Sequence, residues 1–557
     1  MTVKAEAAGQ TGGPHNMQDY ASTYATFQPE VPEYFNFAYD VVDTFAEDPD
    51  REMMYWVQDG GPERRLSYAY FRDRSAQAGR SLLKLGLKQG DTVFILMPRL
   101  PEWWESILGM MKAGIVAMPG TTQLTAKDIL FRLQNSHARA IITDIENAAK
   151  FDEALSQYPD LQIKLVVGGD REGWTSFEAA VSAESTDAAR LCNTKSSDPL
   201  LLYFTSGTTG YPKMVLHTHS SYPIGHISTG RYWLDLQPGD LHWNLADTGW
   251  AKAAWSSFFG PLNMGVSIFV HHTKARYTAD YTLNLMGKYG VTSFCAPPTI
   301  YRMFIVEDLK KYDLSKLRNC VGAGEPLNSE VIEVWRRETG HTIRDGYGQT
   351  ETCLLCGNFP TPDMPVKPGS MGKPAPGYVV DVIDEEGNPL PDGKEGDIAV
   401  QVKPKRPVGL FQEYLNNPGA TNASMRGDWY VTGDRAYRDE DGYLWFVGRA
   451  DDVIISAGYR IGPFEVESAL VEHPAVMEAA VVAKPDEVRG EIVKAFIILN
   501  SNYTGSPELA QEIQKFVQQI TAPYKYPREI EFVTELPKTV SGKIRRIELR
   551  QREQKKA

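Results

Sequence analysis

Short apolar runs of strand length alternate along this chain with amphipathic helix patterns, and this alternation constrains the fold more than any other feature. Residues 92–97 form one buried-strand pattern, a helix pattern follows over 103–113, and residues 200–204 form another strand pattern. Farther on, a strand pattern leads into a predicted helix over 326–339, which Gly340 ends before the next strand. Strands that alternate with helices in this way are typical of parallel sheets covered by helices. The sequence therefore predicts an α/β fold of stacked sheets.

The pattern changes in the last third of the chain. Short apolar runs separated by Gly-Asn, Asp-Gly and Glu-Gly turns follow Asp381, and they predict a small antiparallel, β-barrel-like subdomain. After residues 448–452 the pattern becomes compact α+β, with Pro463 at the start of a helix. A chain of 557 residues also exceeds what a single core holds. We predict a disordered lead-in, a large N-terminal α/β domain and a small C-terminal α+β domain, over residues 1–25, 26–450 and 451–557.

The charge balance and the first residues bear on partners and on location. The net charge is −13, which argues against general nucleic-acid or anionic-membrane binding. No stretch of about 18 apolar residues occurs, so a membrane span is not expected. The first twenty residues contain Lys4 but no arginine and no apolar core, unlike a secretory signal or a transit peptide. We therefore expect a cytoplasmic protein.

The cysteines predict reduced thiols. The chain has five of them, an odd number, and no export signal accompanies them. Cys353 and Cys356 have the spacing of a redox or metal half-site, but they lie in apolar company and lack a second ligand pair. Two buried thiols are therefore the favoured interpretation, and a redox or metal site is the alternative.

Residues 203–215 form a hydroxyl- and glycine-rich loop that follows an apolar run and ends near a lysine. Glycines let backbone N–H groups approach an anion, hydroxyls add donors, and the lysine supplies a charge for a polyphosphate. Only five residues separate Gly207 from Lys213, and no Ser or Thr follows the lysine, so this is not the nucleotidase P-loop. Taken alone, a structural glycine-rich turn is the alternative. The predicted phosphate contacts are Thr205, Ser206, Gly207, Thr208, Thr209, Gly210 and Lys213.

Four further motifs follow this loop along the chain. They are Asp-Gly-Tyr-Gly-Gln-Thr-Glu at 345–351, Tyr-Val-Thr-Gly-Asp at 430–434, the segment 448–463 that begins Gly-Arg-Ala-Asp-Asp, and Pro-Lys-Thr-Val-Ser-Gly-Lys-Ile-Arg at 537–545. Together with the loop they resemble the motifs of the AMP-forming acyl-adenylating superfamily, in that family's order and across nearly the whole chain. Each motif alone has a plain structural alternative, such as a turn, a core tyrosine or a solvated charge. Their concordance is far more specific than any one of them.

The resemblance implies roles in forming an acyl-adenylate from ATP. Lys543 resembles the catalytic lysine that bridges the acid's carboxylate and the α-phosphate, and such a bridge stabilises charge that develops at phosphorus. Thr350 matches the threonine that contacts the α-phosphate, and Glu351 matches the glutamate that helps to hold Mg²⁺. Asp434 matches the ribose-binding acid. The other implied nucleotide contacts are Gln123, Asp345, Gly346, Tyr347, Gly348, Gln349 and Arg449.

The family's second step transfers the acyl group to CoA after the small domain turns. Asp451 matches the hinge residue, and Gly458 matches the glycine of the thiol tunnel, where a side chain would obstruct a pantetheine arm. In the medium-chain acyl-CoA synthetase branch, neighbouring positions lie close to CoA. Any one arginine among them would by itself be a surface charge more often than a CoA contact. These positions are Ala457, Gly458, Tyr459, Arg460, Arg489, Tyr526 and Arg528.

The acid itself is predicted from a few pocket positions. Gly348 stands where acetyl-specific relatives carry tryptophan, so the pocket is expected to admit more than a methyl group. Trp250 is predicted as a pocket wall, and Gly322 and Gly324 as parts of the same pocket. Lys252 departs from the apolar residue expected there, and it either assists the carboxylate or phosphate, stacks on a pocket aromatic or is solvated. A medium-chain, branched or aromatic acid is therefore favoured over acetate.

The resemblance implies an ATP-dependent acyl-CoA synthetase that converts a medium-chain, branched or aromatic carboxylic acid and CoA to acyl-CoA, AMP and pyrophosphate, with Mg²⁺ as cofactor. An adenylation enzyme that loads a carrier protein keeps all five motifs, but no carrier-domain serine motif follows Lys543. A luciferase-like oxygenase and a non-catalytic nucleotide-binding scaffold are more remote, because a scaffold is expected to lose Lys543, Glu351 or Asp434. The sequence leaves open the acid and the oligomeric state, a homo-oligomer included.

Overall fold

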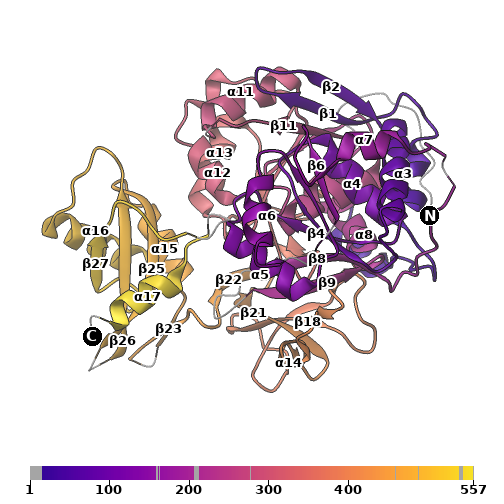
Figure 1. Cartoon of the computed structure of the whole chain (residues 1–557). Helices are drawn as coiled ribbons and strands as arrows, with labels where there is room; N and C mark the ends of the chain where they lie inside the picture. Colours follow the sequence, from indigo (N-terminus) through magenta and orange to yellow (C-terminus); the bar gives the residue numbers. More distant parts are fainter. Residues whose placement is uncertain are drawn as a thin grey trace.

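The N-terminal body of the molecule is built on two large sheets (Figure 1). The computed structural model describes residues 15–158, 161, 163–187, 189–205, 212–275, 277–457, 459–486, 489–538 and 543–555. The first sheet has eight strands in the order β19 (Glu413–Tyr414), β9 (Lys213–Thr218), β8 (Pro199–Thr205), β4 (Val116–Gly120), β3 (Thr92–Leu96), β5 (Ala140–Asp144), β6 (Ile163–Val167) and β7 (Thr175–Ser176). Strands β8 to β7 in this order pair in parallel, whereas β9 and β19 are antiparallel additions at one edge.

The second sheet has nine strands and contains the predicted strand–helix–strand unit. Its order is β16 (Lys373–Pro374), β15 (Leu354–Gly357), β14 (Ile343–Gly348), β13 (Asn319–Ala323), β12 (Ser293–Ala296), β10 (Leu241–Asn244), β11 (Ser267–His272), β1 (Glu52–Gln58) and β2 (Glu63–Ser67). Strands β13 and β14 pair in parallel, with helix α13 (Ser329–Thr339) between them. The helix begins three residues later than predicted because Asn328, its N-cap, has extended backbone. Gly340 ends it in the left-handed conformation that glycine allows.

Helices connect the strands and cover the sheets, as the alternation predicted (Figure 1). Helix α4 (Pro101–Lys112) begins with proline at its first turn and is buried along almost its whole length. The other helices of the body are α2 (Asp43–Phe45), α3 (Tyr68–Lys84), α5 (Ala126–Ser136), α6 (Ala148–Leu155), α7 (Phe177–Ser182), α8 (Ser221–Ser228), α9 (Ala251–Ala253), α10 (Gly260–Met264), α11 (Ala279–Tyr289), α12 (Pro298–Phe304) and α14 (Pro418–Ala423). Three short segments are π-helical, η1 (Ala38–Val42), η2 (Thr229–Trp233) and η3 (Ala254–Phe259), and η4 (Leu309–Lys311) is a 3₁₀ turn.

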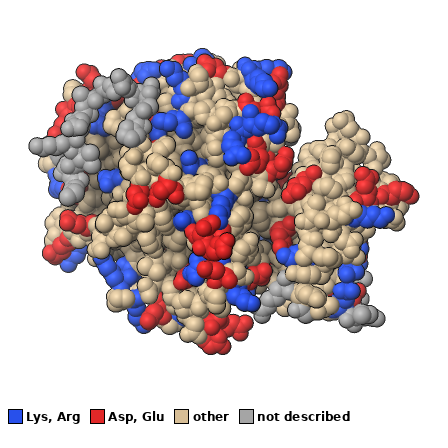
Figure 2. Space-filling model, turned by 180° about the vertical axis from the view of Figure 1, so that it is seen from behind, with Lys and Arg blue, Asp and Glu red and all other residues tan. Residues whose placement is uncertain are grey.

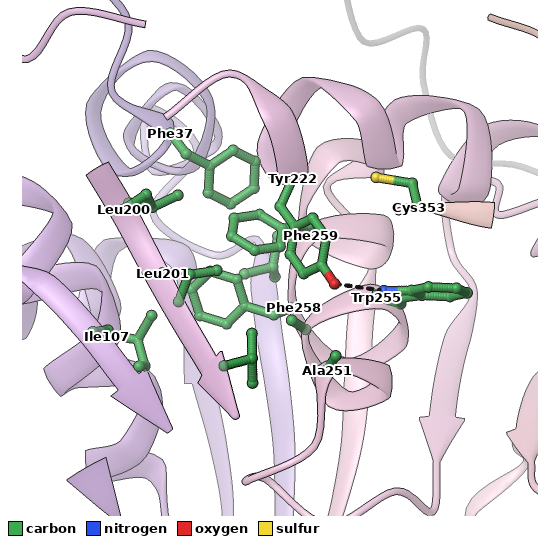
Figure 3. Packing of buried hydrophobic residues seen from close by; sticks show 14 of the residues in the cluster. Phe37, Ile107, Leu200, Leu201, Tyr222, Ala251, Trp255, Phe258, Phe259 and Cys353 are labelled. Atoms are coloured by element: carbon green, nitrogen blue, oxygen red, sulfur yellow. Dashed lines mark hydrogen bonds between the residues drawn. The ribbon is translucent and has the colours of Figure 1, made fainter. Parts of the chain in front are cut away.

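An aromatic core fixes η3 against the first sheet. Leu200 and Leu201 of β8 lie in one buried cluster with Phe258 and Phe259 of η3 and with Tyr222 of α8 (Figure 3). The Phe258 and Phe259 rings pack at a centroid distance of 5.0 Å. Aromatic side chains bury large apolar areas and prefer such edge contacts. The strand that leads into the phosphate loop is therefore held against the segment that follows Lys252.

The last third of the chain forms two smaller sheets. The predicted antiparallel subdomain is confirmed as the path β17 (Val380–Ile383), β18 (Gly396–Gln401), β21 (Trp429–Arg438) and β20 (Met425–Arg426), with β22 (Leu444–Arg449) paired to β21. The C-terminal unit has the sheet order β24 (Tyr459–Ile461), β23 (Ile454–Ser456), β26 (Gly490–Leu499) and β25 (Val476–Asp486), with β27 (Glu529–Phe532) paired to β26. Its helices are α15 (Pro463–Val471), α16 (Pro507–Ile520) and α17 (Arg546–Gln554). This unit stands to one side of the body in Figure 1.

Part of the predicted disordered lead-in is ordered in the structure. Helix α1 (Tyr20–Thr26) is capped by Asp19, whose side chain accepts a hydrogen bond from the Ser22 backbone. The Tyr20 hydroxyl donates to the Pro374 carbonyl at 2.8 Å, and Met17 is fully buried. From residue 15 onward, the described chain therefore packs against the body, because apolar and hydroxyl groups of this segment find partners there.

The surface carries charges of both signs. On the face shown in Figure 2, lysine and arginine side chains are interspersed with aspartate and glutamate, in line with the acidic balance of the sequence. Within the described ranges, no helix has both the length and the apolar character that a bilayer crossing requires.

Candidate nucleotide and acyl site

A cavity of about 1490 Å³ brings the separate motifs together. Residues of the N-terminal body form most of its wall, and the C-terminal unit contributes Lys543 and residues of α17. The predicted residues that line it are Gln123, Thr205, Lys213, Trp250, Lys252, Gly324, Asp345, Gly346, Tyr347, Gly348, Gln349, Thr350, Glu351, Asp434, Arg449 and Lys543. Side chains that lie far apart in the sequence therefore meet at one site.

Asp434, the predicted ribose-binding acid, is held by three neighbours. Its Oδ2 accepts hydrogen bonds from the Tyr347 hydroxyl at 2.6 Å and from Gln349 Nε2 at 2.8 Å. Its Oδ1 accepts a hydrogen bond from Arg449 at 3.1 Å. Asp434 on β21 and Arg449 on β22 are cross-strand partners. Burial and the Asp434 charge raise the pKa of Tyr347 well above its usual range, so the tyrosine stays a donor. The carboxylate is thus fixed at the cavity wall, where it can accept hydrogen bonds from vicinal hydroxyls.

Glu351 and Lys213 meet at one aromatic ring. Glu351 is buried, and its Oε1 accepts a hydrogen bond from the Tyr414 hydroxyl at 2.8 Å. Lys213 Nζ lies 4.6 Å from the centre of the Tyr414 ring. Burial raises the pKa of Glu351, and the Tyr414 hydrogen bond opposes that rise. The acid predicted to hold a cation and the lysine predicted to hold the leaving phosphates therefore share a small region of the cavity.

The space beside Gly348 is already filled. A Cβ atom at this position would lie 2.4 Å from the Cys353 carbonyl oxygen and 2.4 Å from the Trp255 ring. Trp255 comes from η3 and lines the cavity itself. The expectation that Gly348 leaves the acyl pocket open stays a prediction, and the structure adds that an indole from another segment lies directly beside the glycine. Trp255 and Gly348 therefore meet at one wall of the cavity.

The chain matches a family model described as AMP-binding enzyme over residues 42–415. A second model, the AMP-binding enzyme C-terminal domain, matches residues 465–543. The chain belongs to the AMP-binding enzyme family. Among its curated relatives is acyl-coenzyme A synthetase ACSM3 of Mus musculus, which is 49% identical over 554 residues and aligns over 98% of this chain and 95% of that protein.

Solved structures of acyl-CoA synthetases and CoA ligases are similar to this chain along nearly its whole length. The Brucella canis acyl-CoA synthetase is 35% identical, with a TM-score of 0.75 and coverage of 97% of this chain and 100% of that chain. The anthranilate CoA ligase AuaEII, solved in complex with anthranoyl-AMP, is 31% identical, with a TM-score of 0.86 and coverage of 94% and 98%. The predicted mixed α/β fold with a separate C-terminal unit is confirmed, and the chain is an AMP-forming acyl-CoA synthetase that uses ATP, CoA and a carboxylate.

The expected cytoplasmic location of this AMP-binding enzyme is wrong. The curated ACSM3 relatives from mouse, rat and human are all named mitochondrial, which contradicts this expectation. The expectation rested on the missing leader pattern in the first twenty residues. The lack of a recognisable leader does not determine a compartment.

Most of the predicted CoA contacts lie away from the cavity. Ala457, Tyr459, Arg489, Tyr526 and Arg528 belong to the C-terminal unit and do not line the cavity that holds Lys543. The Ala457 backbone N–H donates to the Arg489 carbonyl at 2.9 Å, which places both near the start of β26. The Arg528 guanidinium lies 5.0 Å from the centre of the Tyr526 ring, beside the same strand. The structure therefore groups these residues with one another but not with the nucleotide-side motifs.

The predicted hinge residue lies outside the cavity lining, and several predicted loop residues lie outside the described part of the chain. Asp451 does not line the cavity, and its Oδ1 lies 3.6 Å from Arg449 Nε between β22 and β23. The predicted residues that lie outside the described set are Ser206, Gly207, Thr208, Thr209, Gly210 and Gly458, and the side chain of Arg460.

Gly322 and Gly324 differ in their relation to the cavity. Gly324 lines it, whereas Gly322 does not. A Cβ atom at Gly322 would lie 3.6 Å from Leu327 and 3.7 Å from Ile343, within the core. The role of Gly322 in the pocket therefore stays a prediction, and the structure places the Cβ side of this β13 residue against the core.

Lys252 projects to the end of β13. Its Nζ donates a hydrogen bond to the Ala323 carbonyl, and the side chain lines the cavity. Burial lowers the pKa of Lys252. The hydrogen bond distinguishes it from a solvated lysine, because a buried ammonium group needs such acceptors.

Removing the Lys252 amine is expected to weaken binding of the acid. Lys252→Met keeps the apolar stem, so we expect the KM for the acid to rise about tenfold while the KM for ATP changes little, since one charged hydrogen bond is lost. Steady-state kinetics measure both values, with the acid varied at saturating ATP and CoA and then with ATP varied at saturating acid and CoA. Unchanged turnover together with unchanged acid preference would contradict a role in the pocket and leave Lys252 as a support for Ala323.

Cys353 and Cys356 both lie in the hydrophobic core. Cys353 and Cys356 are buried and unpaired, and burial raises the pKa of both thiols. Among the described residues, no group of three or more His, Cys, Asp or Glu side chains is arranged to hold a metal ion. The prediction that both thiols are buried is confirmed.

Sequence patterns did not identify four residues that shape this site. Tyr414 and Trp255 contact predicted residues directly, and Tyr222 and His217 bond to the Thr350 backbone. None belongs to a motif whose spacing suggests chemistry. Their common signal is aromatic or polar character within otherwise apolar segments, which is equally typical of ordinary core residues.

Proposed function

We propose that this acyl-CoA synthetase prefers medium-chain, branched or aromatic carboxylic acids. The observation that carries the proposal is the single cavity in which Asp434, Glu351 and Lys543 converge beside the aromatic walls Trp250 and Trp255. Pockets for such acids are mostly apolar, with a few placed polar groups. The anthranoyl-AMP bound by the related anthranilate CoA ligase supports an aromatic acid in particular.

In the first step the acid's carboxylate oxygen attacks the α-phosphorus of ATP, and pyrophosphate leaves. We assign Lys543 to the bridge between the carboxylate and the α-phosphate, because a cation there offsets the repulsion of two anions. Thr350 donates to the α-phosphate, and Lys213 steadies the leaving phosphates. Asp434 orients the ribose through its fixed carboxylate.

Mg²⁺ fits the residues present. Glu351 offers a carboxylate of which Tyr414 occupies one oxygen, and Lys213 lies near the same ring. Mg²⁺ in nucleotide sites is typically held by one or two carboxylates, with phosphate oxygens and waters as its other ligands. Glu351 would therefore be its protein ligand, and the bound ion would neutralise charge on the phosphates.

The second step requires a different placement of the C-terminal unit. We propose that residues 451–557 turn as one domain against residues 26–450, with Asp451 as the hinge. The proposed CoA contacts do not line the cavity, whereas Lys543 of the same unit does, so one arrangement does not serve both steps. After the turn, the CoA thiol loses its proton and attacks the acyl carbonyl, and AMP leaves with the electrons of the broken bond.

A panel of acids tests the proposed preference. Pyrophosphate release is measured with acetate, butyrate, hexanoate, octanoate, isobutyrate and benzoate, each with and without CoA. We expect the hexanoate, octanoate or benzoate value of kcat/KM to exceed the acetate value by about a hundredfold, since each buried methylene adds binding free energy. Acetate as the best substrate would contradict the proposal, and turnover that requires a carrier protein in place of CoA would favour the carrier-loading alternative.

A further inference from the structure

Two buried side chains hold the backbone carbonyl of Thr350. The Tyr222 hydroxyl donates to it at 2.5 Å and the His217 Nε2 lies 2.7 Å from it. Both residues are fully buried, with 0% of their surface exposed. A carbonyl oxygen has two lone pairs, so these two bonds satisfy it completely. Buried polar atoms in cores need such partners, but two side chains aimed at one main-chain oxygen make an unusually specific anchor.

The direction of each hydrogen bond is determined. The Thr350 carbonyl only accepts, so His217 Nε2 carries the hydrogen and Nδ1 is the acceptor. Ser221 Oγ lies 3.0 Å from Nδ1 and donates to it. Burial lowers the pKa of His217 to about 3, so the ring is neutral at physiological pH. The His217 and Tyr222 rings pack with centroids 3.6 Å apart, which fixes both donors relative to each other.

The anchored carbonyl lies in a tight turn rather than in a strand. Strand β14 ends at Gly348, and β15 begins at Leu354. Within the turn, the Gln349 backbone N–H donates to Thr352 Oγ1 at 3.0 Å, and the Thr352 backbone N–H donates to the Gln349 carbonyl at 3.2 Å. These local bonds shape the turn, but they leave the Thr350 carbonyl to be placed by side chains from α8 and β9. Its position therefore depends on those two elements.

The anchor connects both ends of the cavity. His217 lies on β9, the strand whose first residue is Lys213 on the phosphate side. On the acyl side, Trp255 Nε1–H donates to the Tyr222 hydroxyl at 3.3 Å, as the dashed line in Figure 3 shows. Trp255 also lines the cavity and contacts the Gly348 position. A continuous chain of contacts thus runs from the acyl wall through Tyr222 to Thr350.

From this geometry we infer that Tyr222 and His217 are positioning residues for Thr350, and that Trp255 transmits the filling of the acyl pocket to it. The inference rests on the proposed contact of Thr350 with the α-phosphate. An acid that presses on the Trp255 ring shifts its N–H group, and Tyr222 passes that shift to the Thr350 turn. An acid that fills the pocket then aligns Thr350 for the attack at phosphorus. In this way, binding of the non-reacting part of the acid raises kcat.

A matched pair of hydroxyl deletions tests the role of Tyr222. Tyr222→Phe removes the hydroxyl that donates to Thr350. Tyr68→Phe is the control, because the Tyr68 hydroxyl is an equally buried donor that bonds to the Val266 carbonyl at a distance of 3.1 Å. Tyr68 does not line the cavity. Each variant leaves a buried carbonyl short of a partner, so both are expected to lose similar thermal stability. We expect only Tyr222→Phe to lower kcat for pyrophosphate release, by about tenfold, with the KM for ATP changed less than about twofold. Equal kcat in both variants would overturn the inference.

Rescue by a conservative variant tests His217. The glutamine side chain places an amide N–H group at nearly the reach of histidine Nε2, whereas leucine has no donor. We expect His217→Gln to retain kcat within about threefold of the native enzyme and His217→Leu to lose about tenfold. The same loss in both variants would show that only the shape of the ring matters and would contradict the positioning role.

Hydrogen exchange gives a readout that does not depend on turnover. We expect amides of residues 343–353 to exchange at least about tenfold faster in Tyr222→Phe than in Tyr68→Phe, because the anchor that restrains the turn is lost. Equal exchange in the two variants would overturn the anchor. If the native enzyme released no pyrophosphate with any acid, the proposed function would fail, and this exchange comparison would still decide the positioning.

Discussion

Replacing Lys543 by alanine is expected to slow acyl-adenylate formation about a thousandfold while thioester formation from supplied acyl-adenylate stays within about threefold of the native rate. Lys543 reaches the cavity from the C-terminal unit, where it accompanies the predicted nucleotide contacts. Its charge is needed while the negative carboxylate approaches the negative α-phosphate. Once the adenylate has formed, that repulsion is gone, so the second step does not need the lysine.

Two half-reaction assays measure this difference. Pyrophosphate release without CoA reports the first step, and conversion of synthetic acyl-adenylate with CoA reports the second. Lys515→Ala is the control, because Lys515 is an exposed lysine on α16 of the same unit. An equal loss in both half-reactions of Lys543→Ala would contradict the assignment.

The structure explains why the lysine segment is held in place. Helix α17 follows Lys543 directly, and Arg546 at its start bonds to both carboxylate oxygens of Glu467, at 3.1 Å and 2.6 Å. Arg550, one turn later, pairs with Asp452 at 2.8 Å. Paired buried charges of this kind fix geometry well because losing one partner leaves the other uncompensated. We therefore expect Lys543 to move together with the proposed hinge at Asp451 rather than independently of it.

Much of the fold followed from local sequence pattern. Apolar residues repeat with the period of a strand or of a helix in several segments, and each period follows from the local backbone geometry. These segments are the strand at 92–96, helix α13 and the antiparallel strands after Asp381. The five motifs also predicted the family, because each is a short contiguous segment whose residue types are set by one ligand group. Motifs that are short and contiguous can be identified in a single sequence without an alignment.

The remaining features depend on packing between distant segments. Trp255 fills the space at Gly348, and Tyr222 bonds to Thr350, although these pairs are far apart along the chain. The π-helical turn η3, which aims Trp255 at the glycine, has no reliable local signature. The relation of Gly322 to the cavity depends on packing in the same way, since the neighbouring helices decide which face of a buried strand meets a cavity.

The largest change in acid preference is expected at Trp255. Its ring closes the pocket beside Gly348, so Trp255→Ala should open room for several more carbon atoms. Each added methylene contributes about 0.8 kcal/mol when buried, so two or three of them change kcat/KM by about ten- to fiftyfold. We therefore expect the ratio of kcat/KM for decanoate to that for hexanoate to rise by at least tenfold. The ratio is informative because a loss of turnover caused by the missing Trp255–Tyr222 hydrogen bond affects both acids.

Gly348→Ala provides the opposite change at the same place. Its new methyl group would approach the Trp255 ring and the Cys353 carbonyl to 2.4 Å, so the ring must move into the pocket or the backbone must shift. We expect lower turnover overall and a preference displaced toward shorter acids. The two variants should thus move the decanoate-to-hexanoate ratio in opposite directions, measured under the same conditions. If both moved it the same way, the ring beside Gly348 would not be the wall that limits the acyl chain, and the limit would lie elsewhere in the cavity.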